Sequence, residues 1–302
     1  MARTDHDTWD LGSGVGSTAT MVAAARAVAS GWPDSFADDH FAAALVRSVG
    51  IDVFTRLASG ELSFADIGGD GGSAWMPYLF GIRTNHFDRF WTSVVADGFR
   101  QVVNLASGLD SRGYRLPCPA GTIAYEIDRP EVIEFKQAVL ADLGAEAKVE
   151  IQAVGVDLRD DCPAALRAAG FDPATPTAWI AEGLMIGFLP GDAQDRLLDD
   201  VSRLSATGSR LAADHVPGSY AVLGEQMRRI GESWLAQGLD ADFANLYYAG
   251  EHHNAETYLQ ERDWETTGAV DTDLFAAAGL AKPAVEFGAG VEGVVYVTAT
   301  RR

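Results

Sequence analysis

The amino-acid sequence predicts an α/β protein with a mostly parallel, doubly wound sheet, preceded by a cap of helices. Residues 1–97 contain helix-like segments only, whereas from Gln101 onward short β-rich runs alternate with helix-like segments. Such alternation is typical of a parallel sheet that carries helices on both faces. We therefore divide the chain into a helical N-terminal cap or lid (residues 1–97) and a core (residues 98–302), which carries a helical insertion at about residues 216–282.

Three helices are expected in the N-terminal region. The alanine-rich segment Ala19–Ser30 is followed by Asp38–Val49 and by the longer, aromatic-rich segment Trp75–Asp97. The aromatic side chains of the last segment can pack the cap onto the sheet or line an acceptor pocket beneath it.

Five strands and three helices are expected in the first part of the core. The strands are Gln101–Ala106, Thr122–Ile127, Val149–Val154, Pro176–Glu182 and Arg210–His215. The helices between them are Pro130–Leu143, Cys162–Ala169 and Asp192–Ala206. Pro130 marks a helix start, because proline fits the first helical turn, where its missing N–H costs nothing.

The last part of the chain is expected to contain the helical insertion and two closing strands. An aromatic stretch that ends near Trp264 follows the fifth strand and is interpreted as helical. The segments Ala284–Phe287 and Gly293–Thr300 are expected to be strands. A hairpin of this kind at the end of a parallel sheet gives one antiparallel closing strand.

The net charge disfavours two classes of partner. Of 302 residues, 43 are acidic and 23 are basic, and the formal net charge at pH 7 is −20. Such a surface repels phosphate backbones and anionic lipid headgroups, so neither nucleic acid nor a membrane is expected as a partner. No apolar run reaches the roughly 18 residues that cross a bilayer. Because Met1–Asp10 has acidic residues where a secretory signal has basic ones, a cytoplasmic protein is expected.

The cysteines and the histidine pair do not predict a metal site. Cys118 and Cys162 are too few for a cysteine-built site and are interpreted as free thiols. The adjacent pair His252-His253 has no acidic ligands nearby at metal-binding spacing and is interpreted as part of a solvated loop.

Two glycine-rich segments compete as the loop that holds a ligand. Asp10–Ser17 matches a nucleotide-binding glycine fingerprint, but polar and charged residues precede it, where such a loop needs a buried strand. This segment can instead be a flap that closes over a site. Val102–Arg112 follows an apolar strand directly, and its Ser107-Gly108 pair lets the backbone approach a ligand closely. The second segment is therefore favoured as the ligand loop.

Acidic residues stand at the carboxyl ends of four consecutive expected strands. Asp110 follows the first strand, Glu126 and Asp128 end the second, Asp157 follows the third, and Glu182 ends the fourth. The carboxyl ends of parallel strands converge on one crevice, where an open α/β sheet binds its ligand. We expect these five carboxylates to face that crevice.

The residue types at the crevice favour an adenosine ligand that carries positive charge. Asp128 can accept hydrogen bonds from both hydroxyls of a ribose, and Asp157 can accept one from an adenine amino group, with the Leu158 amide available to a ring nitrogen. No Gly-x-x-x-x-Gly-Lys-Ser/Thr motif is present, so a triphosphate is not expected. S-adenosylmethionine fits the acidic crevice, and Arg83 could pair with its carboxylate in a forked geometry.

Several segments together resemble one known family. They are Trp9-Asp10-Leu11, Arg83-Thr84, Phe87-Asp88, Val103–Leu116, Tyr125–Val132 with Lys136, Val156–Arg159 and Glu182–Met185. They are similar to the leucine carboxyl methyltransferase family and, within it, to actinobacterial S-adenosylmethionine-dependent methyltransferases. The resemblance implies a Rossmann-like class I methyltransferase fold. It also implies that six residues contact the cofactor: Arg83, Gly108, Asp128, Asp157, Leu158 and Glu182.

The methyl acceptor decides whether a catalytic base is needed. Methyl transfer from a sulfonium is an in-line displacement that depends mainly on positioning and on the exclusion of water. A carboxylate acceptor is already ionised, whereas a hydroxyl acceptor requires a base. His215 and His86 are the candidates for that base, although each also has an ordinary structural explanation. The acceptor is expected to be a small organic or acyl-chain molecule.

Two other functions are compatible with the same residues. A nicotinamide-dependent oxidoreductase can use this fold, but no Gly-x-Gly-x-x-Gly follows the first strand, and Glu182 adds an acid to the crevice. A non-catalytic S-adenosylmethionine binder would share the cofactor residues without transferring a methyl group. The sequence therefore predicts an S-adenosylmethionine-dependent O-methyltransferase, with these two as alternatives.

Overall fold

The computed structural model describes residues 11–12, 14–67, 73–217, 220–235, 246–248, 250–281 and 293–302. Its strands are β1 (Gln101–Leu105), β2 (Ile123–Asp128), β3 (Glu150–Gly155), β4 (Thr177–Met185), β5 (Arg210–His215), β6 (Trp264–Val270) and β7 (Val295–Arg301). They form one seven-stranded sheet in the order β3-β2-β1-β4-β5-β7-β6. The first five strands are parallel, and β7 runs antiparallel to both β5 and β6.

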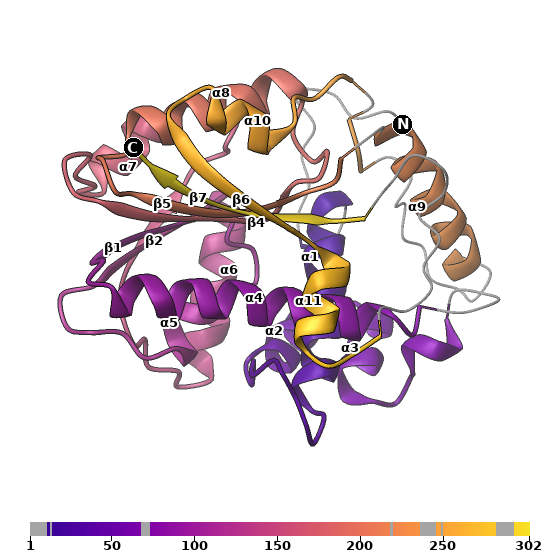
Figure 1. Cartoon of the computed structure of the whole chain (residues 1–302). Helices are drawn as coiled ribbons and strands as arrows, with labels where there is room; N and C mark the ends of the chain where they lie inside the picture. The colour runs from indigo at the N-terminus through magenta and orange to yellow at the C-terminus, as the bar shows by residue number, and fades with distance from the viewer. Residues whose placement is uncertain are drawn as a thin grey trace.

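Helices cover both faces of this sheet (Figure 1). They are α1 (Gly14–Ser30), α2 (Ala42–Val49), α3 (Asp52–Ser59), η1 (Phe64–Asp66), α4 (Met76–Ala96), α5 (Arg112–Arg115), α6 (Pro130–Asp142), α7 (Cys162–Ala168), α8 (Gly191–Arg203), α9 (Tyr220–Leu235), α10 (Ala255–Gln260) and α11 (Asp271–Ala277). Helices α7, α8 and α10 lie on one face, and α4, α5, α6 and α11 lie on the other (Figure 1). The predicted doubly wound α/β sheet with a closing antiparallel strand is confirmed.

Successive side chains of the buried strands point alternately to the two faces of the sheet, so each strand contributes to the core on both faces. Val103 of β1 packs with Leu166 of α7, whereas its neighbour Val102 packs with Phe87 and Trp91 of α4. Successive strand residues point to opposite faces, so a strand covered on both sides must be apolar throughout. Each such side chain contributes roughly 1.5–3 kcal/mol when it is fully buried.

The late part of the chain differs from the sequence-based prediction. Trp264 was expected in a helical stretch, but it begins strand β6 and is buried, with its indole N–H donating to Ser202 Oγ at 2.9 Å. The β-branched pair Thr266-Thr267 favours a strand, and pairing with β7 fixes it there. The short helices α3 and α5 were not predicted. Of the two expected closing strands, Gly293–Thr300 corresponds to β7, and Ala284–Phe287 lies outside the described residues.

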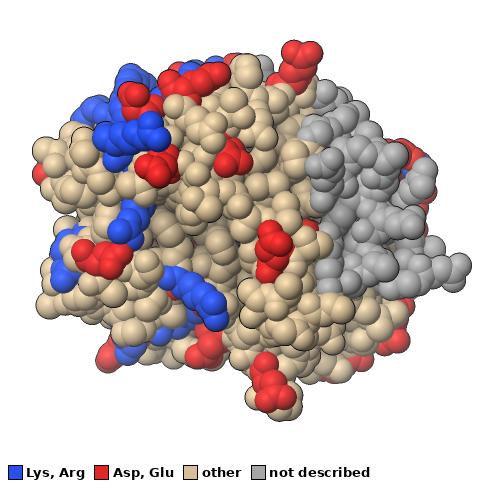
Figure 2. Space-filling view, in the orientation of Figure 1, with Lys and Arg blue, Asp and Glu red and all other residues tan. Residues whose placement is uncertain are grey.

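Charged side chains are distributed unevenly over the surface. On the face seen in Figure 2, acidic residues are scattered, whereas basic residues gather toward one side. Both cysteines, Cys118 and Cys162, are free, as predicted. None of the helices within the described ranges combines the length and the apolar character that spanning a bilayer requires.

Helix α4 approaches α1 closely at Gly81. A Cβ atom at this position would lie 2.6 Å from Phe36 Cε2 and 2.9 Å from Ala29 Cβ. We expect Gly81→Val to lower the free energy of unfolding by roughly 1–3 kcal/mol, because the added atoms overfill a packed contact. Urea unfolding measures the change, with Ser93→Ala on the exposed face of the same helix as the control. Equal stability of both variants would contradict close packing at Gly81.

Candidate functional site

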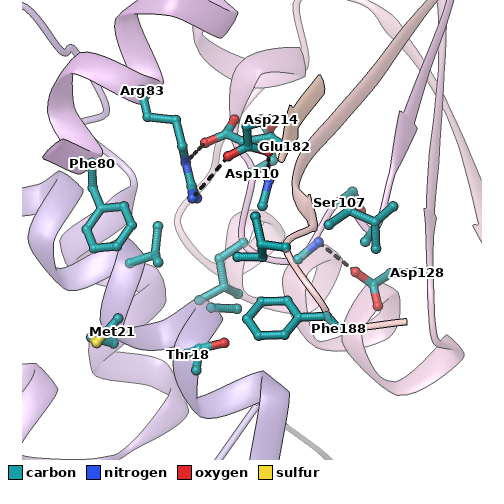
Figure 3. Close-up of a pocket in the computed structure, with 18 of the residues that line it drawn as sticks. Thr18, Met21, Phe80, Arg83, Ser107, Asp110, Asp128, Glu182, Phe188 and Asp214 are labelled. Atoms are coloured by element: carbon teal, nitrogen blue, oxygen red, sulfur yellow. Dashed lines mark hydrogen bonds and ion pairs between the residues drawn. The ribbon is translucent and has the colours of Figure 1, made fainter. Parts of the chain in front are cut away.

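A cavity of about 250 Å³ lies at the carboxyl ends of the parallel strands. Its wall is built from the segments that end or follow β1 to β5, together with residues of α1, α4 and α9. All six residues implied to contact a cofactor line this one cavity: Arg83, Gly108, Asp128, Asp157, Leu158 and Glu182. Figure 3 shows Arg83, Glu182 and Asp214 gathered on one side of the pocket and Asp128 on another.

The loop after β1 is held against the end of β2. Gly108 has a φ of +46°, and Ala106, two residues before it, has a φ of +53°. This turn directs the Gly108 N–H to Asp128 Oδ2 at 2.7 Å, while Asp128 Oδ1 accepts from the Arg129 N–H at 2.8 Å. Each carboxylate oxygen can accept a second hydrogen bond. Burial raises the pKa of Asp128, and the two amides oppose that shift because they stabilise the charged form.

Asp157 follows β3 and is held by its own turn. Its carboxylate accepts from the backbone N–H and from Nε of Arg159, both at 2.9 Å, and from Nη2 of Arg159 at 2.7 Å. Burial favours a higher pKa for Asp157, but the Arg159 hydrogen bonds and charge hold it below its ordinary value. Asp157 is therefore ionised at neutral pH and fixed in place beside Leu158.

A buried ion cluster with Arg112 at its centre lies behind the cavity wall, which its acids Asp110 and Glu182 line. Arg112 Nε lies 2.7 Å from Asp88 Oδ1, and Nη1 contacts both Asp110 and Glu182, the latter at 2.7 Å. Arg115 extends the cluster through two further contacts with Asp88. Burial favours higher pKa values for Asp110 and Glu182, but the charge of Arg112, together with that of Lys136 for Asp110 and of Arg83 for Glu182, holds both below their ordinary values.

Arg83 belongs to the same cluster, which changes the role expected for it. Its Nε donates to Glu182 Oε1 at 2.9 Å, and its Nη1 lies 3.6 Å from Asp214 Oδ2 (Figure 3). The Arg83 guanidinium was expected to pair with a ligand carboxylate, but much of it is already paired with carboxylates of the protein itself. Gly183 makes this possible, because a Cβ atom there would lie 3.2 Å from both terminal nitrogens of Arg83.

Asp214, at the end of β5, is a lining residue that the sequence analysis missed. It is 1% exposed, and its Oδ1 accepts from the Gly183 N–H at 2.5 Å. Burial raises the pKa of Asp214 to about 6, because Arg83 compensates only in part and the Glu182 charge adds to the shift. The rule that selected Glu182 at the end of the fourth expected strand could also have selected Asp214, which stands near the end of the fifth.

Both candidate histidines lie outside the lining of the cavity. His215 follows Asp214 directly, and strand alternation turns the two side chains to opposite faces of the sheet. His86 lies one turn after Arg83 on α4 and packs its ring 5.1 Å from that of Tyr296. Burial lowers the pKa of each histidine.

Glu126 was expected to face the crevice, and the structure corrects this. Its carboxylate lies 2.8 Å from the Nζ of Lys136, which is fully buried and also donates to Ser107 Oγ at 3.2 Å. Glu126 precedes Asp128 by two residues but does not line the cavity. Of the five acids expected there, the other four do.

The two competing glycine-rich segments meet at the same cavity. Leu11 of the first segment lines it, as does Thr18, which directly follows that segment, and Ala19 Cβ would lie 3.8 Å from a Cβ atom at Gly108. The favoured segment supplies the loop after β1, whereas residues from Gly14 onward form the start of α1. Residues 1–10 and 13 lie outside the described part of the chain.

The remainder of the cavity wall is largely apolar. Met21 comes from α1, Met76 and Phe80 from α4, and Phe188 from the segment after β4. Phe188 stacks on Tyr247, with 5.4 Å between ring centroids. The cavity therefore has an ionic side at the strand ends and an apolar side beneath α1 and α4, as Figure 3 shows for Met21 and Phe80.

The late histidine pair makes local contacts. His252 contacts the carbonyls of Gly250 and Leu189, and His253 Nδ1 lies 2.7 Å from Asp195 Oδ2. Within the described ranges, no group of three or more His, Cys, Asp or Glu side chains is arranged to hold a metal ion.

Comparison with known proteins identifies the family. Residues 19–202, more than half of the chain, match the model of the leucine carboxyl methyltransferase family. The chain belongs to this family, and the sequence-based prediction of a methyltransferase is confirmed.

Individual relatives agree along the whole chain. A protein of Mycobacterium sp. (strain KMS), named "Putative S-adenosyl-L-methionine-dependent methyltransferase", is 52% identical over 302 residues and covers 100% of both chains. A protein of the same name from Mycobacterium marinum is 52% identical over 304 residues, which cover 100% of this chain and 99% of that one.

Two solved structures share the fold. A DUF574 family protein of Streptomyces avermitilis has a TM-score of 0.53 at 15% identity, covering 93% of this chain and 97% of that one. A structure from Thermobifida fusca, titled as a putative methyltransferase, has a TM-score of 0.51 at 14% identity, covering 94% of each chain. At these identities the likeness shows the fold alone.

Removal of the central cation should unbalance the ion cluster. Arg112→Met leaves the buried carboxylates of Asp88, Asp110 and Glu182 without their shared partner, so we expect a loss of about 3–5 kcal/mol in the free energy of unfolding. Arg112→Lys keeps the charge but cannot reach all three acids. Its free energy of unfolding should therefore lie between those of the wild type and Arg112→Met. Guanidinium unfolding at pH 7 measures both, and a Met variant within about 1 kcal/mol of the wild type would contradict this role.

Proposed function

We propose that this protein transfers the methyl group of S-adenosylmethionine to an oxygen atom of a small, largely apolar acceptor. The observation that carries the proposal is the convergence of Gly108, Asp128 and the Asp157-Leu158 pair on one cavity at the strand ends. In this arrangement Asp128 accepts from the ribose hydroxyls, and Asp157 and the Leu158 amide hold the adenine.

The charge of the cavity suits this cofactor. Among the described residues, five carboxylates and four guanidinium groups line it, namely those of Asp110, Asp128, Asp157, Glu182, Asp214, Arg26, Arg83, Arg129 and Arg159. The one excess negative charge complements a ligand whose sulfonium and ammonium outnumber its single carboxylate. A dinucleotide with a pyrophosphate has the opposite sign, so the same charges disfavour the oxidoreductase alternative.

The chain's own residues act mainly by positioning. S-adenosylmethionine supplies an activated methyl group, and the fixed carboxylates of Asp128 and Asp157 set its orientation. Met21, Phe80 and Phe188 exclude water and offer an apolar surface to the acceptor. An apolar wall of this size supports a small organic or acyl-chain acceptor.

The residues that line the cavity also suggest separate roles for the N-terminal region and the rest of the chain. We propose that residues 1–97 serve as a cap that completes the acceptor side, since α1 and α4 contribute Met21 and Phe80 to the cavity. Residues 98–302 supply the cofactor loops. The net charge of −20 favours a small cytoplasmic molecule over nucleic acid or a membrane lipid as the acceptor.

Calorimetric titration distinguishes the cofactors. We expect S-adenosylhomocysteine to bind and NADH not to bind at the same concentrations, and preference for NADH would contradict the proposal. Incubation with methyl-labelled S-adenosylmethionine and a panel of small acids and phenols then separates a methyltransferase from a non-catalytic binder. Tight cofactor binding without any transfer of label would favour the binder.

Asp128 provides the sharpest test of cofactor placement. Asp128→Ala should weaken S-adenosylhomocysteine binding by about 1.5–3 kcal/mol, because hydrogen bonds to a carboxylate are lost. The control is Asp142→Ala, which removes an exposed carboxylate at the end of α6. Calorimetry that finds unchanged affinity for Asp128→Ala would remove Asp128 from the cofactor site.

A further inference from the structure

Tyr247 is a polar residue on the apolar side of the cavity that the proposed cofactor contacts do not use. It lines the cavity, is partly exposed and stacks on Phe188, with 5.4 Å between ring centroids. Within the described part of the chain its hydroxyl makes no hydrogen bond, and it is not one of the buried polar atoms that lack a partner. The hydroxyl therefore keeps accessible surface, and a ligand in the cavity can reach it.

Two neighbouring phenols differ from Tyr247 in this respect. The Tyr296 hydroxyl is enclosed by the protein and has no partner among the described residues. Tyr220 of α9 donates its hydroxyl to the Met185 carbonyl at 3.1 Å. Of these three phenols, Tyr247 is therefore the one whose hydroxyl can meet a ligand.

Contacts with the loop after β4 hold Tyr247 in place. The next residue, Tyr248, donates its backbone N–H to the Gly187 carbonyl at 2.9 Å, and the stack on Phe188 orients the Tyr247 ring. Burial raises the pKa of Tyr247 above its ordinary value. The phenol is therefore neutral at physiological pH and can donate one hydrogen bond from a fixed position.

The surroundings of Tyr247 belong to the acceptor side of the cavity. Its stacking partner Phe188 lies apart from Arg83 and Glu182 in Figure 3. The polar groups proposed for the cofactor stand at the strand ends, whereas the loop after β4 presents apolar side chains such as Ile186 and Phe188 to the cavity. We therefore assign a ligand group that meets the Tyr247 hydroxyl to the acceptor.

The chemistry of methyl transfer favours a neutral donor at this place. A carboxylate acceptor needs no base, and both candidate bases, His86 and His215, lie outside the described lining. When a carboxylate attacks a sulfonium, the two opposite charges cancel on the way to a neutral ester. A cation beside the carboxylate would stabilise the starting ions more than the transition state, whereas a phenol hydroxyl holds the oxygen without a net charge.

We propose that the Tyr247 hydroxyl binds the reacting carboxylate of the acceptor, and that the acceptor is an apolar carboxylic acid. This inference rests on the proposed methyl transfer and adds the residue that recognises the acceptor. Tyr247 donates to one carboxylate oxygen, and the other oxygen attacks the methyl group. Phe188 packs against the apolar body of the acceptor.

The transfer step balances without a proton. The attacking oxygen forms a bond to the methyl carbon, and the bond between that carbon and sulfur breaks with its electron pair on sulfur. The sulfonium becomes the neutral thioether of S-adenosylhomocysteine, and the carboxylate becomes a methyl ester. Since no proton changes hands, no base is required.

Two probes of similar shape test the hydrogen bond. 2-Naphthoate carries a carboxylate where 2-ethylnaphthalene carries an apolar group, and ligand-observed NMR measures their binding to the protein saturated with S-adenosylhomocysteine. Tyr247→Phe should weaken 2-naphthoate binding roughly tenfold or more, the loss of one hydrogen bond to a charged group, and leave 2-ethylnaphthalene binding within about twofold. A merely structural role of Tyr247 would change both affinities alike.

Kinetics test whether the bound carboxylate reacts. With S-adenosylmethionine and 2-naphthoate, the wild type should form methyl 2-naphthoate, which mass spectrometry detects. Tyr247→Phe should raise the KM for 2-naphthoate roughly tenfold and leave the KM for S-adenosylmethionine within about twofold. Binding of 2-naphthoate without formation of the ester would contradict a reacting carboxylate at Tyr247.

A matched control keeps the outcomes distinct. Tyr78→Phe removes a hydroxyl from an exposed tyrosine of α4 outside the described lining, so it should bind both probes as the wild type does. Unaltered 2-naphthoate binding in Tyr247→Phe, an equal loss of both probes, or no binding of 2-naphthoate to the wild type would overturn the inference. Loss of S-adenosylhomocysteine affinity in Tyr247→Phe would also overturn it, by placing the hydroxyl at the cofactor. Failure of the wild type to bind S-adenosylhomocysteine would overturn the proposed function itself.

Discussion

The ion cluster around Arg112 is the interaction on which the rest of the site depends. One guanidinium joins Asp88 of α4, Asp110 of the loop after β1 and Glu182 of β4. Removing four charges from water is expensive, and the cluster is tolerated because each charge meets opposite charges at hydrogen-bond distance. The geometry ties helix α4 to strand β4 and to the loop after β1. It thereby fixes the wall on which a ligand must lie.

The same cluster sets the chemistry of the cavity. Arg83 lies between Glu182 and Asp214, so two carboxylates share this cation at the end of β4 and β5. The Arg83 charge offsets only part of the effect of burial on Asp214, so the pKa of Asp214 remains raised, at about 6. A buried carboxyl that titrates near neutral pH is suited to proton transfer, whereas Asp110, whose pKa Arg112 lowers, is suited to holding charge. Asp214 and Asp110 are thus both buried beside arginines, but the pKa of the first is raised and that of the second is lowered.

Sequence reasoning succeeded where local rules decide the outcome. Alternation of β-rich and helix-like segments predicted the sheet and most of its helices. The rule that ligands bind at the carboxyl ends of strands pointed to Gly108, Asp128 and Glu182, which line one cavity. It failed where a residue's role depends on partners far along the chain. Strand β6 exists because β7 pairs with it, and Trp264 carries no local sign of that pairing.

The sequence also did not reveal which side chains contact each other in the folded protein. Glu126 resembles Asp128 in type and position, but a lysine ten residues later, Lys136, is buried against it and withdraws it from the cavity. His215 was considered as a candidate base because of its residue type, and Asp214 was not considered, although the period of two along a strand allows only one of these neighbours to face the site.

A crystal structure with bound S-adenosylhomocysteine tests the central claim most directly. The account predicts the ribose hydroxyls at hydrogen-bond distance from Asp128, the adenine beside Asp157 and Leu158, and the sulfur directed toward the part of the cavity that Asp214 and Tyr296 border. An adenosine group over β5 and β7, with Asp128 free of contact to the ligand, would contradict it.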